Sequence, residues 1–93
     1  MKKLHYSSQF KKDFKKYKLY PAKVEALDKV LRFLAAGQPL PKEYKAHVLK
    51  GNFKGCWECH IEDDYLLVWI DDYLIDLLRL GTHSELFGKK KGK

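Results

Sequence analysis

The stretch KGCWECHIEDDYLLVWIDDYLIDLLRL, residues 54–80, decides the fold of this chain. Its middle segment, Tyr65–Ile70, is nearly all apolar, as expected of a central strand that is buried on both faces. The acidic pairs Asp63-Asp64 and Asp71-Asp72 turn the chain on either side of it. The flanking strands are then predicted to be Lys54–Ile61 and Tyr73–Leu80. Short turns between consecutive strands predict an antiparallel meander.

A short strand and an amphipathic helix are predicted at the start of the chain. Lys3–Tyr6 alternates polar and apolar side chains, which indicates a strand, and Ser7 or Ser8 then offers a helix N-cap. Apolar side chains follow at helical spacing: Phe10, Phe14 and Tyr17. The positions around them hold Lys11, Lys12, Lys15, Lys16 and Lys18. This pattern predicts a helix with a cationic outer face.

A second helix is predicted between Pro21 and Gly37. Pro21 suits the first helical turn, and Gly37 stands where a C-terminal cap belongs. The stripe expected to be buried consists of Val24, Leu27, Val30, Leu31 and Leu34. Gln38–Pro41 holds two prolines and is predicted to be a loop.

These elements predict one α+β domain that spans residues 1–93. Two N-terminal helices pack on an antiparallel sheet of about four strands, and Leu86-Phe87 forms a short C-terminal element. The last five residues, 89–93, read KKKGK and are predicted to be a disordered basic tail.

The composition points to an anionic partner. Nineteen Lys and Arg oppose twelve Asp and Glu, which gives a net charge of +7 at pH 7. A small basic domain usually meets nucleic acid, an acidic protein or an anionic membrane, or is simply a soluble basic protein. No apolar run has the length of a signal peptide or a membrane helix, so we expect a cytoplasmic protein with no membrane association and reduced cysteines.

The segment Cys56-Trp57-Glu58-Cys59-His60 matches the attachment signature of c-type haem. The surroundings argue against haem, because no export signal precedes the segment and the single methionine is Met1. In a strand, Cys56 and Cys59 also point to opposite faces, whereas paired cysteine chemistry needs both sulfurs on one side. We therefore interpret each cysteine as a small packing residue and expect neither a cofactor nor a metal.

Three histidines fall at the ends of predicted strands: His47, His60 and His83. Strand alternation places Glu58 and His60 on the same face. A charged Glu58 on a core face would be costly, so we expect that face to be open or to line a groove. Arg79 lies four residues before His83, and both are expected to reach that groove.

Imidazoles beside cations have the chemistry needed to cleave RNA without a metal. A base takes the 2′-hydroxyl proton, an acid protonates the leaving 5′-oxygen, and cations stabilise the phosphate. Imidazole can fill the first two roles near neutral pH. Arg79 and Lys54 are candidates for the third, and a carboxylate such as Asp64 can orient a histidine. Phe87 is either a core contact or a surface on which a base stacks.

A structural explanation exists for each of these residues. A single histidine at a strand end is more often structural than catalytic, and the acidic pairs are ordinary turn residues by composition. The number of histidines and the nearby arginine leave the catalytic and the structural interpretation about equally supported by the residues alone.

Residues 40–88 closely resemble the YafQ branch of the RelE/ParE toxin superfamily, and the two preceding helices extend the resemblance over nearly the whole chain. The matching positions are Leu40-Pro41-x-x-Tyr44-Lys45-x-His47-x-Leu49-x-Gly51, Lys54-Gly55, Glu58-x-His60, Asp64, Leu66–Trp69 and Arg79-x-Gly81-Thr82-His83-x-x-Leu86-Phe87-Gly88. One position departs from the pattern: the family often has an arginine where this chain has Trp57.

The resemblance implies a RelE-like fold and a toxin of a type II toxin–antitoxin pair that cleaves messenger RNA on the ribosome without metal. The matching positions put five residues at the active site: His47, His60, Asp64, His83 and Phe87. Lys54, Glu58 and Arg79 would bind the substrate beside them. By likeness to the family, His83 is the general acid, His60 or His47 the base with Asp64 assisting, and Phe87 holds a base of the RNA.

The partners implied are the ribosome, messenger RNA and an antitoxin of the DinJ/RelB-like group. The toxin is expected to be a monomer when free and to form a heterotetramer with its antitoxin. Two alternatives stay open: a non-enzymatic toxin like the ParE branch, and a basic RNA-binding module. The three histidines argue against the ParE alternative, because that branch does not need them.

Overall fold

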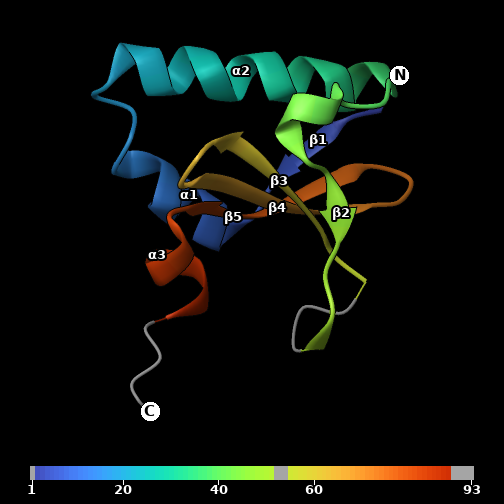
Figure 1. The fold of residues 1–93 in the computed structure, drawn as a ribbon. Helices are drawn as coiled ribbons and strands as arrows, with labels where there is room; N and C mark the ends of the chain where they lie inside the picture. Colours follow the sequence, from blue (N-terminus) through green and yellow to red (C-terminus); the bar gives the residue numbers. More distant parts are fainter. Residues whose placement is uncertain (1, 52–54, 89–93) are drawn as a thin grey trace.

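The computed structural model describes residues 2–51 and 55–88 and contains two layers of helices around one sheet (Figure 1). The strands are β1 (Leu4–Tyr6), β2 (His47–Val48), β3 (Trp57–Glu62), β4 (Tyr65–Asp71) and β5 (Ile75–Gly81). The helices are α1 (Ser8–Lys15), α2 (Pro21–Ala36), the 3-10 turn η1 (Lys42–Tyr44) and α3 (His83–Phe87). None of the described helices is both long and apolar enough to cross a membrane.

The sheet confirms the predicted meander and extends it at both edges. Its strand order is β1-β5-β4-β3-β2, with β4 antiparallel to both of its neighbours, β3 and β5. The described residues form five strands where about four were predicted. The sheet is also not purely antiparallel, because β1 runs parallel to β5 with Leu4 opposite Ile75. The chain between β1 and β5 contains both helices and the other three strands, so it is long enough for the crossover that a parallel pairing requires.

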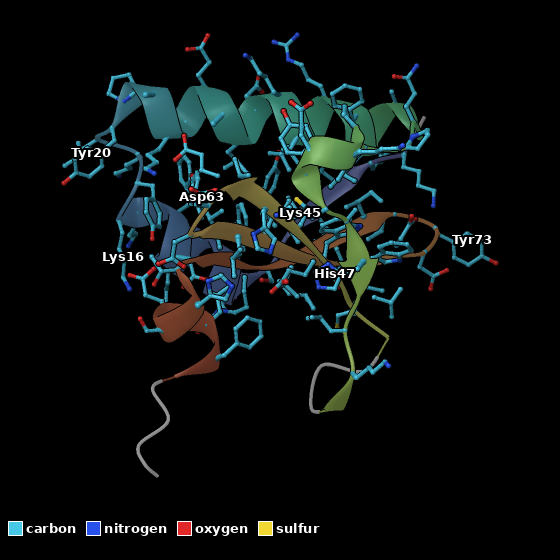
Figure 2. All side chains as sticks on the ribbon, in the orientation of Figure 1. Lys16, Tyr20, Lys45, His47, Asp63 and Tyr73 are labelled. Carbon is cyan, nitrogen blue, oxygen red and sulfur yellow. The ribbon has the colours of Figure 1, made fainter. Side chains whose placement is uncertain are left out.

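The predicted bounds of two strands need correction. β5 begins at Ile75 rather than Tyr73, because residues 72–74 form the turn, in which the Asp72 amide donates to the Leu74 carbonyl. Tyr73 is accordingly 95% exposed at the tip of this turn (Figure 2). β3 begins at Trp57, and Lys54 lies outside the described residues, as does the tail 89–93.

Local signals place the helix ends. The Ser7 hydroxyl accepts a hydrogen bond of 3.0 Å from the Phe10 amide and caps α1. Pro21 is the first residue of α2, and Gly37 ends it with φ of 72°, a left-handed conformation that glycine adopts without strain. Both helices therefore begin and end within the predicted limits, although Tyr17 lies in the turn after α1.

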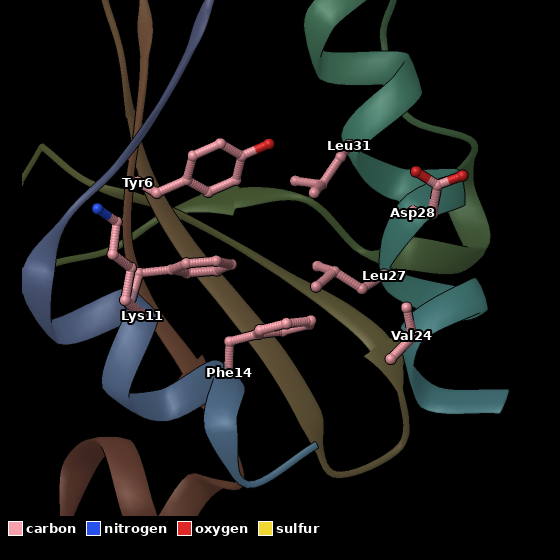
Figure 3. A pocket seen from close by; sticks show the side chains of 8 residues that line it. Tyr6, Lys11, Phe14, Val24, Leu27, Asp28 and Leu31 are labelled. Atoms are coloured by element: carbon pink, nitrogen blue, oxygen red, sulfur yellow. The ribbon is translucent and has the colours of Figure 1, made fainter. Parts of the chain in front are cut away.

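The main core lies between the sheet and the helices α1 and α2. Its buried members include Phe10, Leu27, Val30, Leu67 and Leu77. An apolar groove of about 390 Å³ remains between the two helices and β1 (Figure 3). Aromatic and aliphatic side chains line it, among them Tyr6, Phe14, Leu27 and Leu31.

A second, smaller cluster covers the opposite face of the sheet. Leu66 and Val68 of β4 pack there with Leu86 of α3, so β4 is buried on both faces as predicted. Cys59 belongs to the main core and Cys56 packs against the second cluster, which confirms that the two cysteines face opposite sides. Both are free thiols. Burial raises the pKa of Cys59 to about 12, as expected of a packing residue rather than a reactive thiol.

Candidate functional site

Four aromatic rings form a row on the face of the sheet that carries α3. His47 comes from β2, His60 from β3, and His83 and Phe87 from α3. Successive ring centroids lie 6.4 Å, 5.6 Å and 6.4 Å apart, in the order His47, His60, His83 and Phe87. Figure 2 shows His47 on β2, the edge strand of the sheet. The structure thus brings together four candidates that are separated by up to 40 positions in the sequence.

Sheet register explains why two of these histidines meet. His60 lies opposite Leu66 of β4, and Leu66 lies opposite Gly81 at the end of β5. The chain enters α3 two residues after Gly81, and Leu86 anchors that helix on Leu66 and Val68. His83 is the first residue of α3 and is therefore delivered next to His60.

Asp64 holds His83 through two hydrogen bonds. The same oxygen, Oδ1, lies 2.8 Å from the His83 amide nitrogen and 2.6 Å from its Nδ1. The hydrogen bond from the His83 amide, and then the one from its ring, keep the pKa of Asp64 below its ordinary value. Because an ionised carboxylate only accepts hydrogen bonds, Nδ1 of His83 carries a hydrogen. Nε2 is left for proton exchange with a substrate.

The carboxylate of Glu58 lies close to the rings of His47 and His60. Its Oε1 is 3.1 Å from Nε2 of His47 and 4.0 Å from Nε2 of His60. Glu58 is only 4% exposed, so the expectation that its face would be open is wrong at this position. The reason is the second apolar cluster, which covers that face beside Val68, the residue opposite Glu58. A buried carboxylate needs polar partners, and two imidazoles lie within ion-pairing distance of it.

A backbone carbonyl orients His47 from its other side. Its Nδ1 lies 2.7 Å from the carbonyl oxygen of Lys45. Lys45 has φ of 52°, the only non-glycine residue with positive φ in the described part of the chain. This conformation ends η1 and turns the chain into β2. Backbone strain at a residue that contacts a site histidine is typical of functional positions.

Arg79 is on the site face of the sheet, but its guanidinium is paired with Asp13 of α1. Nε donates to Oδ2 of Asp13 at 2.8 Å and Nη2 to Oδ1 at 3.3 Å. The Leu80 amide also donates to Oδ2, at 2.9 Å, so the carboxylate takes the place of a neighbouring strand at this edge of β5. Arg79 therefore lies opposite Val68, which lies opposite Glu58, but its guanidinium is held by Asp13.

Sequence reasoning missed Asp13. It is 3% exposed and receives a further hydrogen bond of 3.1 Å from Gln9. The signal was present, because Asp13 is the only acid among the lysines of residues 11–18 and follows the buried Phe10 by three positions. That spacing places it on the inward side of α1.

A polar hollow of about 280 Å³ adjoins His60 on the side away from His83. Residues from η1 and from the β3–β4 turn line it, including Tyr44, Lys45, Glu62 and Asp63. Among the described residues, no group of three or more His, Cys, Asp and Glu side chains is arranged to hold a metal ion. The site histidines face single carboxylates instead.

The comparisons with known proteins agree with the fold. The family described as "Bacterial toxin of type II toxin-antitoxin system, YafQ" matches residues 2–88. The mRNA interferase toxin YafQ of Escherichia coli K12 is 36% identical over 87 residues, which are 91% of this chain and 95% of that protein.

Solved structures match over the same range. The YafQ chain in the Escherichia coli DinJ–YafQ complex is 34% identical with a TM-score of 0.84, and the match covers 95% of this chain and all of that one. A metal-bound toxin from Helicobacter pylori is 41% identical with a TM-score of 0.85, over 94% of this chain and all of that one. This chain belongs to the YafQ family of toxins from type II toxin–antitoxin systems.

Proposed function

We propose that this toxin is an endoribonuclease that cleaves messenger RNA on the ribosome by histidine acid–base catalysis, without a metal. The observation that carries the proposal is the row of His47, His60, His83 and Phe87, with ring centroids 5.6 to 6.4 Å apart. The name of the Escherichia coli relative, an mRNA interferase, supports the substrate class, because the match covers 95% of that protein.

The reaction begins at the 2′-hydroxyl of the RNA. A base removes its proton, and the oxygen attacks the adjacent phosphorus. The bond from phosphorus to the 5′-oxygen breaks, and that oxygen takes a proton from a general acid. The products are a 2′,3′-cyclic phosphate, which water can open to a 3′-phosphate, and a 5′-hydroxyl end. Proton transfer on both sides of the phosphate needs two groups that titrate near neutral pH, and imidazole is such a group.

His83 is the general acid in this proposal. Its Nδ1 hydrogen is committed to Asp64, so the opposite nitrogen, Nε2, points away from that contact and can hold the proton for the leaving oxygen. The base is His60 or His47, both of which lie against the buried carboxylate of Glu58. Glu58 thereby orients the two rings.

The reacting phosphate of the RNA is negatively charged, so the mechanism requires cations near the row of rings. Arg79 is one candidate, and its pairing with Asp13 means that it acts at a distance or only after this pair opens. Lys54 is the other candidate and lies outside the described residues. Trp57 offers no charge where the family often has arginine. Phe87 is 39% exposed beside His83 and supplies a surface on which an RNA base stacks.

The basic first helix supports binding to ribosomal RNA. Five lysines of residues 11–18 are exposed, namely Lys11, Lys12, Lys15, Lys16 and Lys18. Binding through several phosphate contacts should weaken steeply as salt is raised. A DinJ-type antitoxin is the proposed partner in the cytoplasm, in a heterotetramer, with a monomeric toxin when the antitoxin is absent. The DinJ–YafQ complex of a 34% identical relative supports that partner class.

The test compares induced expression of the wild type, His83→Ala and His5→Ala in a bacterial host. His5 is a matched control, because its Nδ1 also pairs with an aspartate, Asp76, at 2.9 Å, but on β1 away from the row of rings. Growth is followed, and 5′-hydroxyl ends on messenger RNA are mapped. We expect growth arrest with cuts in register with codons for the wild type and for His5→Ala, and neither for His83→Ala.

Other outcomes decide between the alternatives. Growth arrest without new 5′-hydroxyl ends would point to a toxin that acts on another target, as the ParE branch does. Cuts that His83→Ala still makes would remove His83 from the mechanism. A well-expressed wild-type chain without effect on growth or messenger RNA would refute the nuclease and favour a binding module.

A further inference from the structure

One carboxylate joins α3 to the end of α1. Oε1 of Glu85 accepts a hydrogen bond of 2.6 Å from the Tyr17 hydroxyl and one of 2.9 Å from the Thr82 amide. Its Oε2 lies 3.4 Å from Nζ of Lys16. Figure 2 shows Lys16 beside α3. Thr82 and Glu85 form a capping box at the start of α3, but the contact with Tyr17 spans 68 positions in the sequence and is not needed for a cap.

Tyr17 contacts one residue close to Asp64 in the sequence and one close to His83. Its ring packs on the ring of Tyr65, the residue after Asp64, with centroids 4.9 Å apart. Its hydroxyl bonds to Glu85, two residues after His83. A single side chain therefore links the segment that supplies the carboxylate to the helix that supplies the imidazole.

The electrostatics keep this link intact near neutral pH. The hydrogen bond from Tyr17 is the main reason that the pKa of Glu85 is lowered. Burial first, and the bond to Glu85 second, raise the pKa of Tyr17. The phenol therefore stays a neutral donor and the carboxylate a charged acceptor. A bond of this type is stronger than one between two neutral groups.

Gly81 makes room for the carboxylate. A Cβ atom at this position would lie 2.5 Å from Oε1 of Glu85, closer than such atoms approach in proteins. Gly81 also has φ of 156°, which disfavours other residues. The glycine at the end of β5 and the carboxylate at the start of α3 thus fit together.

We propose that Tyr17 and Glu85 are positioning residues that hold α3 so that His83 keeps its hydrogen bond to Asp64. The inference rests on the proposed function in one respect, that His83 transfers a proton. α3 has only five residues and is too short to be stable alone, so its orientation depends on contacts. Leu86 anchors one side of it in the second apolar cluster, and Glu85 anchors the other side on Tyr17 in the turn after α1. A displacement of about 1 Å at a reacting group can lower a rate about a hundredfold.

The experiment compares Tyr17→Phe, Glu85→Ala and Glu85→Gln with the wild type and with Tyr73→Phe. Tyr73→Phe makes the same chemical change as Tyr17→Phe at a residue that is 95% exposed. Tyr17→Phe retains the packing on Tyr65, and Glu85→Gln retains Oε1 as an acceptor. Cleavage of messenger RNA is measured with purified ribosomes, and the ring nitrogens of His83 are followed by ¹⁵N NMR on the free toxin.

We expect Tyr17→Phe and Glu85→Ala to cleave about tenfold to a hundredfold more slowly, with a smaller loss for Glu85→Gln and none for Tyr73→Phe. In the wild type, the NMR spectrum should show the His83 hydrogen on Nδ1. In Tyr17→Phe and Glu85→Ala the hydrogen should exchange between the two ring nitrogens of His83, so the spectrum should show an average of the two tautomers.

Two results would overturn the inference. One is a wild-type rate and a wild-type His83 spectrum in Tyr17→Phe and Glu85→Ala. The other is a slower reaction with an unchanged His83 spectrum, which would mean that Tyr17 acts elsewhere, for example on the ribosome. If the wild type itself does not cleave RNA, the proposed function fails, and the NMR comparison still decides whether Tyr17 and Glu85 hold His83.

Discussion

The ion pair between Asp13 and Arg79 offers a test of how burial sets the strength of a charge pair. Two ion pairs among the described residues have nearly the same distance between a carboxylate oxygen and the Nε of an arginine, although Asp13 also accepts from Nη2 of Arg79. Oδ2 of Asp13 lies 2.8 Å from Nε of Arg79, and Oδ2 of Asp28 lies 2.7 Å from Nε of Arg32. The side chains of the first pair are 4% and 25% exposed, whereas those of the second are 54% and 80% exposed. The same substitution, aspartate to asparagine, can therefore be made in both.

The expected losses differ several-fold. Asp13→Asn removes the charge that faces Arg79 and turns an amide group toward donors, which include the Leu80 amide. Breaking a buried pair costs about 3–5 kcal/mol, and the partial exposure of Arg79 places the expected loss near the lower end, at about 3 kcal/mol. Asp28→Asn should cost less than about 0.5 kcal/mol, because solvent screens an exposed pair. For a domain of this size, about 3 kcal/mol lowers Tm by about 12–24 °C.

Urea unfolding at pH 7, followed by circular dichroism, measures both variants against the wild type. The reasoning requires an unchanged dependence on urea, so that the midpoint alone reports stability. A loss below about 1 kcal/mol for Asp13→Asn, or equal losses for the two variants, would refute the argument that burial decides the strength of these pairs. The double variant Asp13→Leu/Arg79→Met should recover part of the loss, since it leaves no unpaired buried charge.

Three further predictions follow from single contacts. Gly81→Ala should displace the Glu85 carboxylate and reproduce the effect of Tyr17→Phe on the His83 NMR spectrum, while the same change at Gly51, which has open space around it, should not. Iodoacetamide at pH 8 should label the half-buried Cys56 in the folded protein and Cys59 only after unfolding, as mass spectrometry would show; fast labelling of Cys59 would contradict its burial and raised pKa. Because the pKa of Asp64 is lowered in the folded state, its charged form stabilises the fold above about pH 4, and this stabilisation is lost as pH falls through the lower folded pKa. The difference in urea midpoint between wild type and Asp64→Asn should therefore shrink below about pH 4, and a difference that does not shrink would contradict this expectation.

Much of the fold could be predicted because its signals are local. The alternation and turns of residues 54–80 specify three strands whose order follows from short connections. Ser7 marks the start of α1 through its side-chain hydroxyl, and Pro21 and Gly37 mark the ends of α2 through their backbone preferences. The opposite faces of Cys56 and Cys59 follow from the two-residue period of a strand. In each case the physical cause acts within a few residues, so the pattern is visible in the sequence.

The site residues could be chosen from the sequence by type and by family resemblance, but their contacts could not. Whether His47, His60 and His83 meet depends on the register of β2, β3 and β4 and on where α3 docks. The burial of Glu58 was missed because a strand pattern does not show that another element covers the face. The two-residue period of a strand tells which face of the sheet a side chain is on, but not whether another element covers that face.

The meander, the approximate limits of both helices, the basic surface of α1 and the residue types available for proton transfer are readable from the sequence alone. The parallel pairing of β1 with β5, the contact of Asp13 with Arg79 and that of Tyr17 with Glu85 depend on how the layers assemble. These contacts join residues 66 to 71 positions apart. Their energies depend on which sheet edge is open and which groups are shielded from water, and both are properties of the assembled layers rather than of any short stretch of chain.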